Sequence, residues 1–177
     1  KEVEDVKEKL KELVERNRDE NRKTKEELRR LVEKNRKENE ESKKRLKEIV
    51  EEIRERVKEG RSEAVERVRK TIEDIMEDLD RSLRRVEDIV TKLAKESDDS
   101  LRRVEEIIRE LLKILDRGDK DLREVEKTAE KVSKEDKETN DRIRKDLKKV
   151  SDEDKRSNEE VNKRVDKVRK EIEEERK

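Results

Sequence analysis

Hydrophobic residues recur along the chain at alternating steps of three and four, the spacing that gathers side chains on one face of an α-helix. The pattern begins at Val3, Val6 and Leu10 and continues almost to the last residue. The chain has no proline and only two glycines, Gly60 and Gly118, which stand where a helix can end. The pattern therefore predicts three very long helices, over residues 2–59, 62–117 and 120–176.

Each glycine is followed within two residues by a side chain that can cap the next helix. Ser62 follows Gly60, and Asp119 follows Gly118. Connections this short force neighbouring helices to run antiparallel. We therefore expect an all-α fold, an up-down-up antiparallel three-helix bundle that forms a single elongated domain over residues 1–177.

The hydrophobic pattern restarts every eighteen residues rather than every seven. In the first helix the two copies are LKELVERNRDENRKTKEE from Leu10 and LRRLVEKNRKENEESKKR from Leu28, and similar pairs begin at Asp80 and Val132. Eighteen residues in five turns is about 3.6 residues per turn, the period of an undistorted helix, whereas a seven-residue period imposes a left-handed supercoil. The repeat therefore predicts nearly straight helices.

Polar residues interrupt the inward face of all three helices. If the antiparallel helices are matched in height, polar positions fall opposite polar positions and form two layers, one in each repeat. The first layer comprises Asn17, Asn21, Thr24, Ser97, Ser100, Asp136, Thr139 and Asn140, and the second comprises Asn35, Asn39, Ser42, Ser82, Asp154, Ser157 and Asn158.

These layers are expected to specify which helix pairs with which, and at what height. A buried polar group without a partner costs about 1–3 kcal/mol, so a slip by one turn that sets Asn against Leu is penalised. The expected contacts are Asn21 with Ser100 and Asp136, Thr24 with Ser97 and Thr139, Asn39 with Ser82 and Asp154, and Ser42 with Leu79 and Ser157.

The composition mainly excludes functions. The chain is 62% charged with 55 acidic and 55 basic residues interspersed, which supports helices but gives no charged face for nucleic acid or membrane. The chain has no His or Cys, the side chains on which most nucleophilic or acid–base catalysis and most zinc sites depend. It has no aromatic residue on which the bases of a single-stranded nucleic acid could stack. We expect a soluble protein with no catalytic residues, no metal and no cofactor. The cellular compartment stays open.

A row of extra apolar residues lies beside the inward face of the first two helices. It comprises Val14, Val32, Val50, Val90, Ile108 and Leu112. Such residues either widen the intramolecular core or form a surface for self-association. Both alternatives stay open, and no partner is required for the fold.

The polar layers, the Glu, Lys and Arg surface, the single-glycine turns and the eighteen-residue repeat together resemble de novo designed helical bundles with buried hydrogen-bond networks, here in a single-chain three-helix form. The resemblance covers the whole chain and implies a structural scaffold. The alternative is a helical interaction module that forms a homo-oligomer or pairs with a complementary designed chain. The mass in solution distinguishes these two functions.

Overall fold

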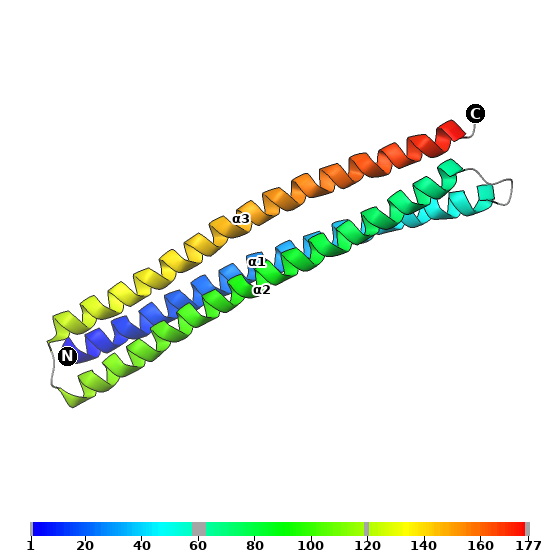
Figure 1. Ribbon diagram of the computed structural model, residues 1–177. Helices are drawn as coiled ribbons and strands as arrows, with labels where there is room; N and C mark the ends of the chain where they lie inside the picture. The colour runs from blue at the N-terminus through cyan, green and yellow to red at the C-terminus, as the bar shows by residue number, and fades with distance from the viewer. Residues whose placement is uncertain (1, 58–62, 119–120, 176–177) are drawn as a thin grey trace. The chain divides into compact units, whose positions relative to one another are not determined.

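The computed structural model describes residues 2–57, 63–118 and 121–175, and almost all of them are helical. The helices are α1 (Glu2–Val57), α2 (Glu63–Arg117) and α3 (Leu122–Glu175). All three pack against one another, and α2 runs opposite to α1 and α3 (Figure 1). The chain is therefore an all-α, antiparallel three-helix bundle, as the sequence predicts.

The second connection shows how one helix ends and the next begins. Gly118 has a positive φ of 70°, and its backbone N–H donates to the carbonyl of Leu115 at 3.2 Å, which ends α2 in a left-handed residue. The Asp121 carboxylate accepts from the backbone N–H of Arg123 at 3.1 Å and caps α3. Because the cap is Asp121, the helix begins at Leu122, and the predicted start at about residue 120 lies outside the described residues.

The remaining predicted turn residues, Gly60, Ser62 and Asp119, lie outside the described residues. Acidic side chains occupy the first turn of each helix, where they face the positive end of the helix dipole. They are Glu2, Glu4 and Asp5 in α1, Glu63 and Glu66 in α2, and Glu124 in α3.

The packing contacts fall into two units, and all three helices contribute to both. Unit 1 consists of Lys1–Arg30 and Val90–Lys148, and unit 2 consists of Leu31–Ile89 and Lys149–Lys177. Each unit holds one apolar cluster and one of the two sets of polar residues.

The apolar cluster of unit 1 takes side chains from all three helices. Half-buried residues at its edge include Val14 and Leu112, and Ile108 is fully buried within it. These members of the extra apolar row thus widen the core. The buried members are Val6, Leu10, Val104, Ile108, Leu111, Leu115, Val125, Ala129 and Val132.

The apolar cluster of unit 2 is built in the same way. Val50, from the extra row, and Met76 are half-buried against it. Burying a Leu or Ile side chain stabilises a fold by about 1.5–3 kcal/mol, so these clusters are the main source of stability. The buried members are Leu46, Ile49, Ile53, Val68, Ile72, Ile75, Leu79, Val161, Val165, Val168 and Ile172.

Candidate functional site: the buried polar layers

Asp136 of α3 is the centre of the polar layer in unit 1. Its side chain is 1% exposed, and it accepts two hydrogen bonds from the other helices. Asn17 Nδ2 of α1 donates to Asp136 Oδ2 at 2.8 Å and also to the carbonyl of Ser133 at 3.1 Å. Ser100 Oγ of α2 donates to Asp136 Oδ1 at 2.5 Å. One carboxylate therefore connects all three helices.

A second set of bonds lies one helical turn along from the first. Asn21 Nδ2 donates to Ser97 Oγ at 2.9 Å, and Ser97 Oγ donates to Asn140 Oδ1 at 2.7 Å. Asn140 Nδ2 then donates to the backbone carbonyl of Asp136 at 2.9 Å. Asn21 Nδ2 also donates to Asp98 Oδ1 at 3.2 Å. The chain of bonds runs from α1 through α2 to α3 without leaving the core.

The height of α1 differs from the expectation by one helical turn. Asn21 was expected opposite Ser100 and Asp136, but it donates to Ser97, and Asn17 takes the place beside Asp136. The pairing of α2 with α3 is the expected one, because Ser100 donates to Asp136. Asn occupies both positions on α1, so matching polar residues to polar residues could not distinguish the two heights.

The two threonines of this layer turn back to their own helices rather than to each other. Thr24 Oγ1 donates to the Glu20 carbonyl at 3.0 Å, and Thr139 Oγ1 donates to the Glu135 carbonyl at 3.0 Å. The expected contact of Thr24 with Ser97 and Thr139 is thus replaced by local bonds, which a threonine in a helix forms readily.

The polar layer of unit 2 repeats the central pair. Asn35 Nδ2 donates to Asp154, as Asn17 does to Asp136, and both pairs are 119 residues apart in sequence. Asn39 Nδ2 donates to the backbone carbonyl of Leu79 at 2.8 Å, rather than to Ser82 or Asp154 as expected. The eighteen-residue repeat therefore preserves the Asn–Asp pair.

The rest of this layer differs because a leucine, Leu79, stands where unit 1 has Ser97. Without that hydroxyl, nothing links the α1 amide to the α3 amide through α2. Asn158, which corresponds to the fully buried Asn140, is half-buried and donates to Glu38 at the edge of the bundle. With Leu79 in place of a serine, unit 2 lacks the bonds through Ser97 that join Asn21 to Asn140 in unit 1.

The serines of unit 2 contribute less than expected. Ser42 is buried and Ser82 is half-buried, and within the described residues neither hydroxyl forms a hydrogen bond. Ser157 is exposed, because the inward face of α3 follows Asp154 and Val161 and leaves Ser157 beside it. The prediction that Ser42 meets Leu79 and Ser157 within the core is therefore wrong for Ser157.

Two oxygen atoms within the layers have no partner. They are Asn17 Oδ1 and Asn35 Oδ1, which are buried and accept no hydrogen bond. An unsatisfied buried acceptor costs about 1–3 kcal/mol. The same amide oxygen is therefore unsatisfied in both units.

Burial is the largest influence on Asp136, and it raises the pKa of this carboxyl above its ordinary value. The hydrogen bonds from Ser100 and Asn17 oppose the shift, whereas the nearby Glu20 carboxylate adds to it. A buried carboxylate is costly to ionise, so Asp136 holds a proton more tightly in the folded chain than in the unfolded one.

Asp154 is affected in the same direction. Burial is again the largest cause that raises its pKa, and Glu38 raises it further, while Lys34 and the bond from Asn35 lower it. Both central carboxyls therefore resist ionisation, although their charged surroundings differ.

Some of the groups that contact the layers had no usable signal in the sequence. The carbonyls of Ser133 and Leu79 accept bonds from asparagines, but every residue carries a carbonyl. Asp98 accepts from Asn21 and pairs with Lys25 at 2.7 Å, and its position just after Ser97 could have indicated this role. Backbone acceptors can be assigned only once the height of the helices is known.

Charged pairs flank the unit 1 layer at the surface. Arg144 of α3 pairs with Glu20 of α1, and Arg142 pairs with Glu96 at 3.0 Å. The Arg144–Glu20 pair is half-buried, whereas the Arg142–Glu96 pair is exposed, and an exposed pair contributes only about 0.2–1 kcal/mol.

The chemistry available to this site is hydrogen bonding. Within residues 2–57, 63–118 and 121–175, no group of three or more Asp or Glu side chains is placed to hold a metal ion. Over the same residues, no helix is long and apolar enough to cross a membrane. No protein family, curated protein or solved structure matches this chain.

Proposed function

We propose that the chain is a designed structural scaffold with no natural biochemical activity, and that its polar layers specify the register and topology of the three helices. In this function the chain holds surfaces at fixed positions, and the layers ensure that only one arrangement does so. Because the acidic and basic residues are equal in number and interspersed, the surface has no excess of positive or negative charge that would attract a charged partner.

The observation that carries the proposal is the repeated Asn–Asp pair. Asn17 with Asp136, and Asn35 with Asp154, have the same donor, the same acceptor and the same separation of 119 residues in two units. Buried polar residues of this kind penalise wrong registers more than they stabilise the right one. A repeated feature that reduces stability is best explained by specificity.

A helical interaction module is the second candidate. It is favoured by one observation, a partly apolar groove between α1 and α2 that is lined by Val14, Ile108 and Leu112. In that case association with another chain would complete the fold rather than add to it.

Light scattering at about 10 μM distinguishes the two functions, because an obligate module remains associated at that concentration. A self-contained scaffold has the mass of one chain, 21.5 kDa, with full helical content by circular dichroism. A stable dimer or trimer at this dilution, or a loss of helix in the monomer, would contradict the scaffold.

A further inference from the structure

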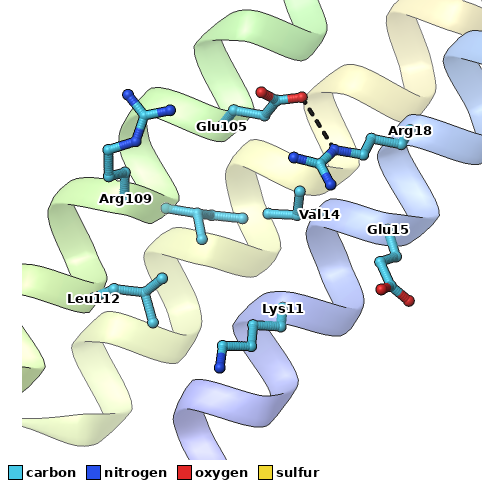
Figure 2. Close-up of a pocket in the computed structure, with 8 residues that line it drawn as sticks. Lys11, Val14, Glu15, Arg18, Glu105, Arg109 and Leu112 are labelled. Carbon is cyan, nitrogen blue, oxygen red and sulfur yellow. Dashed lines mark hydrogen bonds and ion pairs between the residues drawn. The ribbon is translucent and has the colours of Figure 1, made fainter.

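Unit 1 has a groove of about 290 Å³ between α1 and α2 (Figure 2). Its floor is apolar: Val14 of α1 and Leu112 of α2 are half-buried there, and Ile108 is fully buried beneath them. The core beneath is already filled by the chain's own helices. The groove is thus a surface feature with an apolar floor rather than a gap in the core.

The rim of the groove carries charges of opposite sign on the two helices. Arg18 of α1 forms an ion pair with Glu105 of α2 at 3.3 Å. Glu15 and Arg109 are exposed on opposite sides of the groove, and within the described part of the chain they form no ion pair (Figure 2). Arg18 and Glu105 therefore neutralise each other within the chain, whereas Glu15 and Arg109 remain available to charges on another molecule.

The levels of these residues follow from two ion pairs. Lys7 pairs with Asp116 at 2.5 Å, and Arg18 pairs with Glu105 at 3.3 Å, so α1 and α2 are matched in height along this stretch. Glu15 lies one turn before Arg18, and Arg109 lies one turn after Glu105 along the opposite direction. Glu15 and Arg109 are thus in nearly the same register as these two ion pairs, so the ends of their long side chains come at nearly the same level.

We propose that this groove binds the same groove of a second copy of the chain, about a two-fold axis parallel to the helices. Such an axis places α1 of one chain against α2 of the other at the same level, and it keeps them antiparallel. Glu15 then faces the partner's Arg109, and the contact occurs twice. Val14 and Leu112 of the two chains meet at the centre and lose water.

Charge complementarity is what selects a second copy as the occupant. The rim has Lys11, Glu15 and Arg18 on α1, and Glu105 and Arg109 on α2, so Glu15 and Arg18 each meet an opposite charge on α2 of the other copy, and Lys11 is the one rim charge without a counterpart among these residues. A two-fold axis perpendicular to the helices would instead bring α1 against α1. In that arrangement, centred on Val14, Lys11 would meet the partner's Arg18, and like charges repel.

The proposal goes beyond the scaffold function, since it adds reversible association to a fold that is complete in one chain. The apolar floor is small compared with the roughly 1,200–2,000 Å² buried in stable interfaces. We therefore expect a weak dimer, with a dissociation constant on the order of 100 μM.

Sedimentation equilibrium of the full chain from about 10 μM to about 1 mM tests this proposal, in about 0.15 M salt so that long-range charge effects are screened. The average mass should rise from 21.5 kDa toward twice that value. Glu15→Arg alone, and Arg109→Glu alone, should each weaken the dimer at least about tenfold, because each sets two pairs of like charges against each other.

An equimolar mixture of the two variants should associate again, to within about threefold of the unchanged chain. The arginine introduced at position 15 of the first variant then faces the glutamate introduced at position 109 of the second. The unchanged Glu15 of the second variant faces the unchanged Arg109 of the first.

The matched control is Glu33→Arg, an exposed residue of unit 2 one repeat after Glu15. It has the same net charge as Glu15→Arg and should change the association less than about twofold.

The proposal is overturned if the unchanged chain stays at 21.5 kDa up to about 1 mM. It is also overturned if the mixture of Glu15→Arg and Arg109→Glu stays as monomeric as either variant alone, or if Glu33→Arg weakens the dimer as strongly. None of these outcomes bears on the scaffold function, which depends on the mass at about 10 μM.

Discussion

In the buried layer of unit 1, Asn17 Nδ2 of α1 donates a hydrogen bond to Asp136 Oδ2 of α3 at 2.8 Å. The two helices that this bond joins run in the same direction (Figure 1). No short turn connects these two helices, so this contact sets their relative height directly. The bond also leaves a cost, because Asn17 Oδ1 accepts nothing. The proposal that this pair specifies the register of the two helices has consequences that can be measured.

Removing the donor alone should destabilise the fold. Asn17→Leu leaves the Asp136 carboxylate buried with Ser100 as its remaining side-chain donor. The free energy of unfolding at neutral pH should fall by about 1–3 kcal/mol, as urea titration followed by circular dichroism would measure.

Replacing the whole cluster should have the opposite effect. The triple variant Asn17→Leu, Ser100→Ala and Asp136→Leu removes the donors and the buried acceptor together, so that no charge is left unpaired. Its free energy of unfolding should rise by about 1–4 kcal/mol. If the triple variant is less stable than Asn17→Leu, the layer serves stability and not specificity.

The two central carboxyls, Asp136 and Asp154, should make a contribution to the free energy of unfolding that increases as the pH falls. The native pKa values of Asp136 and Asp154 are raised above the ordinary value of about 3.9, so the folded chain takes up these protons first as the pH falls. Their contribution to stability is fully present below the ordinary pKa and is lost as the pH rises through the native pKa.

The double variant Asp136→Asn and Asp154→Asn isolates this contribution, because Asn does not titrate. The stability of the unchanged chain relative to the variant should increase as the pH falls from 7 toward about 4. Urea titrations across this range measure it, and ¹³C spectra of the carboxyl groups give the native pKa values directly. A relative stability that decreases on acidification would contradict the raised pKa values.

The Ser97 hydroxyl should matter more than the Ser82 hydroxyl of the same helix. Ser97→Ala removes an acceptor from Asn21 and a donor to the fully buried Asn140. The free energy of unfolding should fall by about 1–3 kcal/mol.

Ser82→Ala is the matched control for this variant. Ser82 lies on the same helix, and within the described residues its hydroxyl makes no hydrogen bond. The change in helix propensity is the same in both variants, so Ser82→Ala should stay within about 0.5 kcal/mol of the unchanged chain. Equal losses for Ser97→Ala and Ser82→Ala would mean that the bonds of Ser97 contribute nothing.

The helices were predictable because their signals are local. Steps of three and four residues gave the inward faces, and Gly118 gave the end of the second helix at Arg117, while the predicted ends at about residues 59, 62, 120 and 176 lie outside the described residues. The pairing of Ser100 with Asp136 followed from the position of Gly118. The straightness of the helices and the single domain stay predictions.

The height of α1 could not be predicted in the same way. The hydrophobic pattern fixes the inward face of each helix but not the position of one helix along its axis relative to the next. Asn17 and Asn21 lie one turn apart, so either height sets an amide against Asp136. That Asn17 and not Asn21 donates to Asp136 depends on how the side chains pack in three dimensions. The same is true of the hydrogen bond from Asn158 to Glu38 in the unit where Leu79 stands in place of a serine.

The central claim is that the polar layers specify the register of the helices, and spin-label distances test it most directly. The chain has no cysteine, so Cys introduced at the exposed Glu12 of α1 and Lys145 of α3, both in unit 1, can be labelled alone. These two positions differ in level, so a slip of one helical turn, about 5.4 Å along the axis, changes the distance between the labels.

Double electron–electron resonance of the unchanged chain should give one narrow distance peak. A variant in which nine polar residues of the two layers are made apolar should give a second peak or a broad distribution, displaced by about 4–5 Å. A single narrow peak at the same distance in both proteins would contradict the claim. The apolar variant carries Leu at Asn17, Asn21, Asn35, Asn39, Asp136, Asn140 and Asp154, and Ala at Ser97 and Ser100.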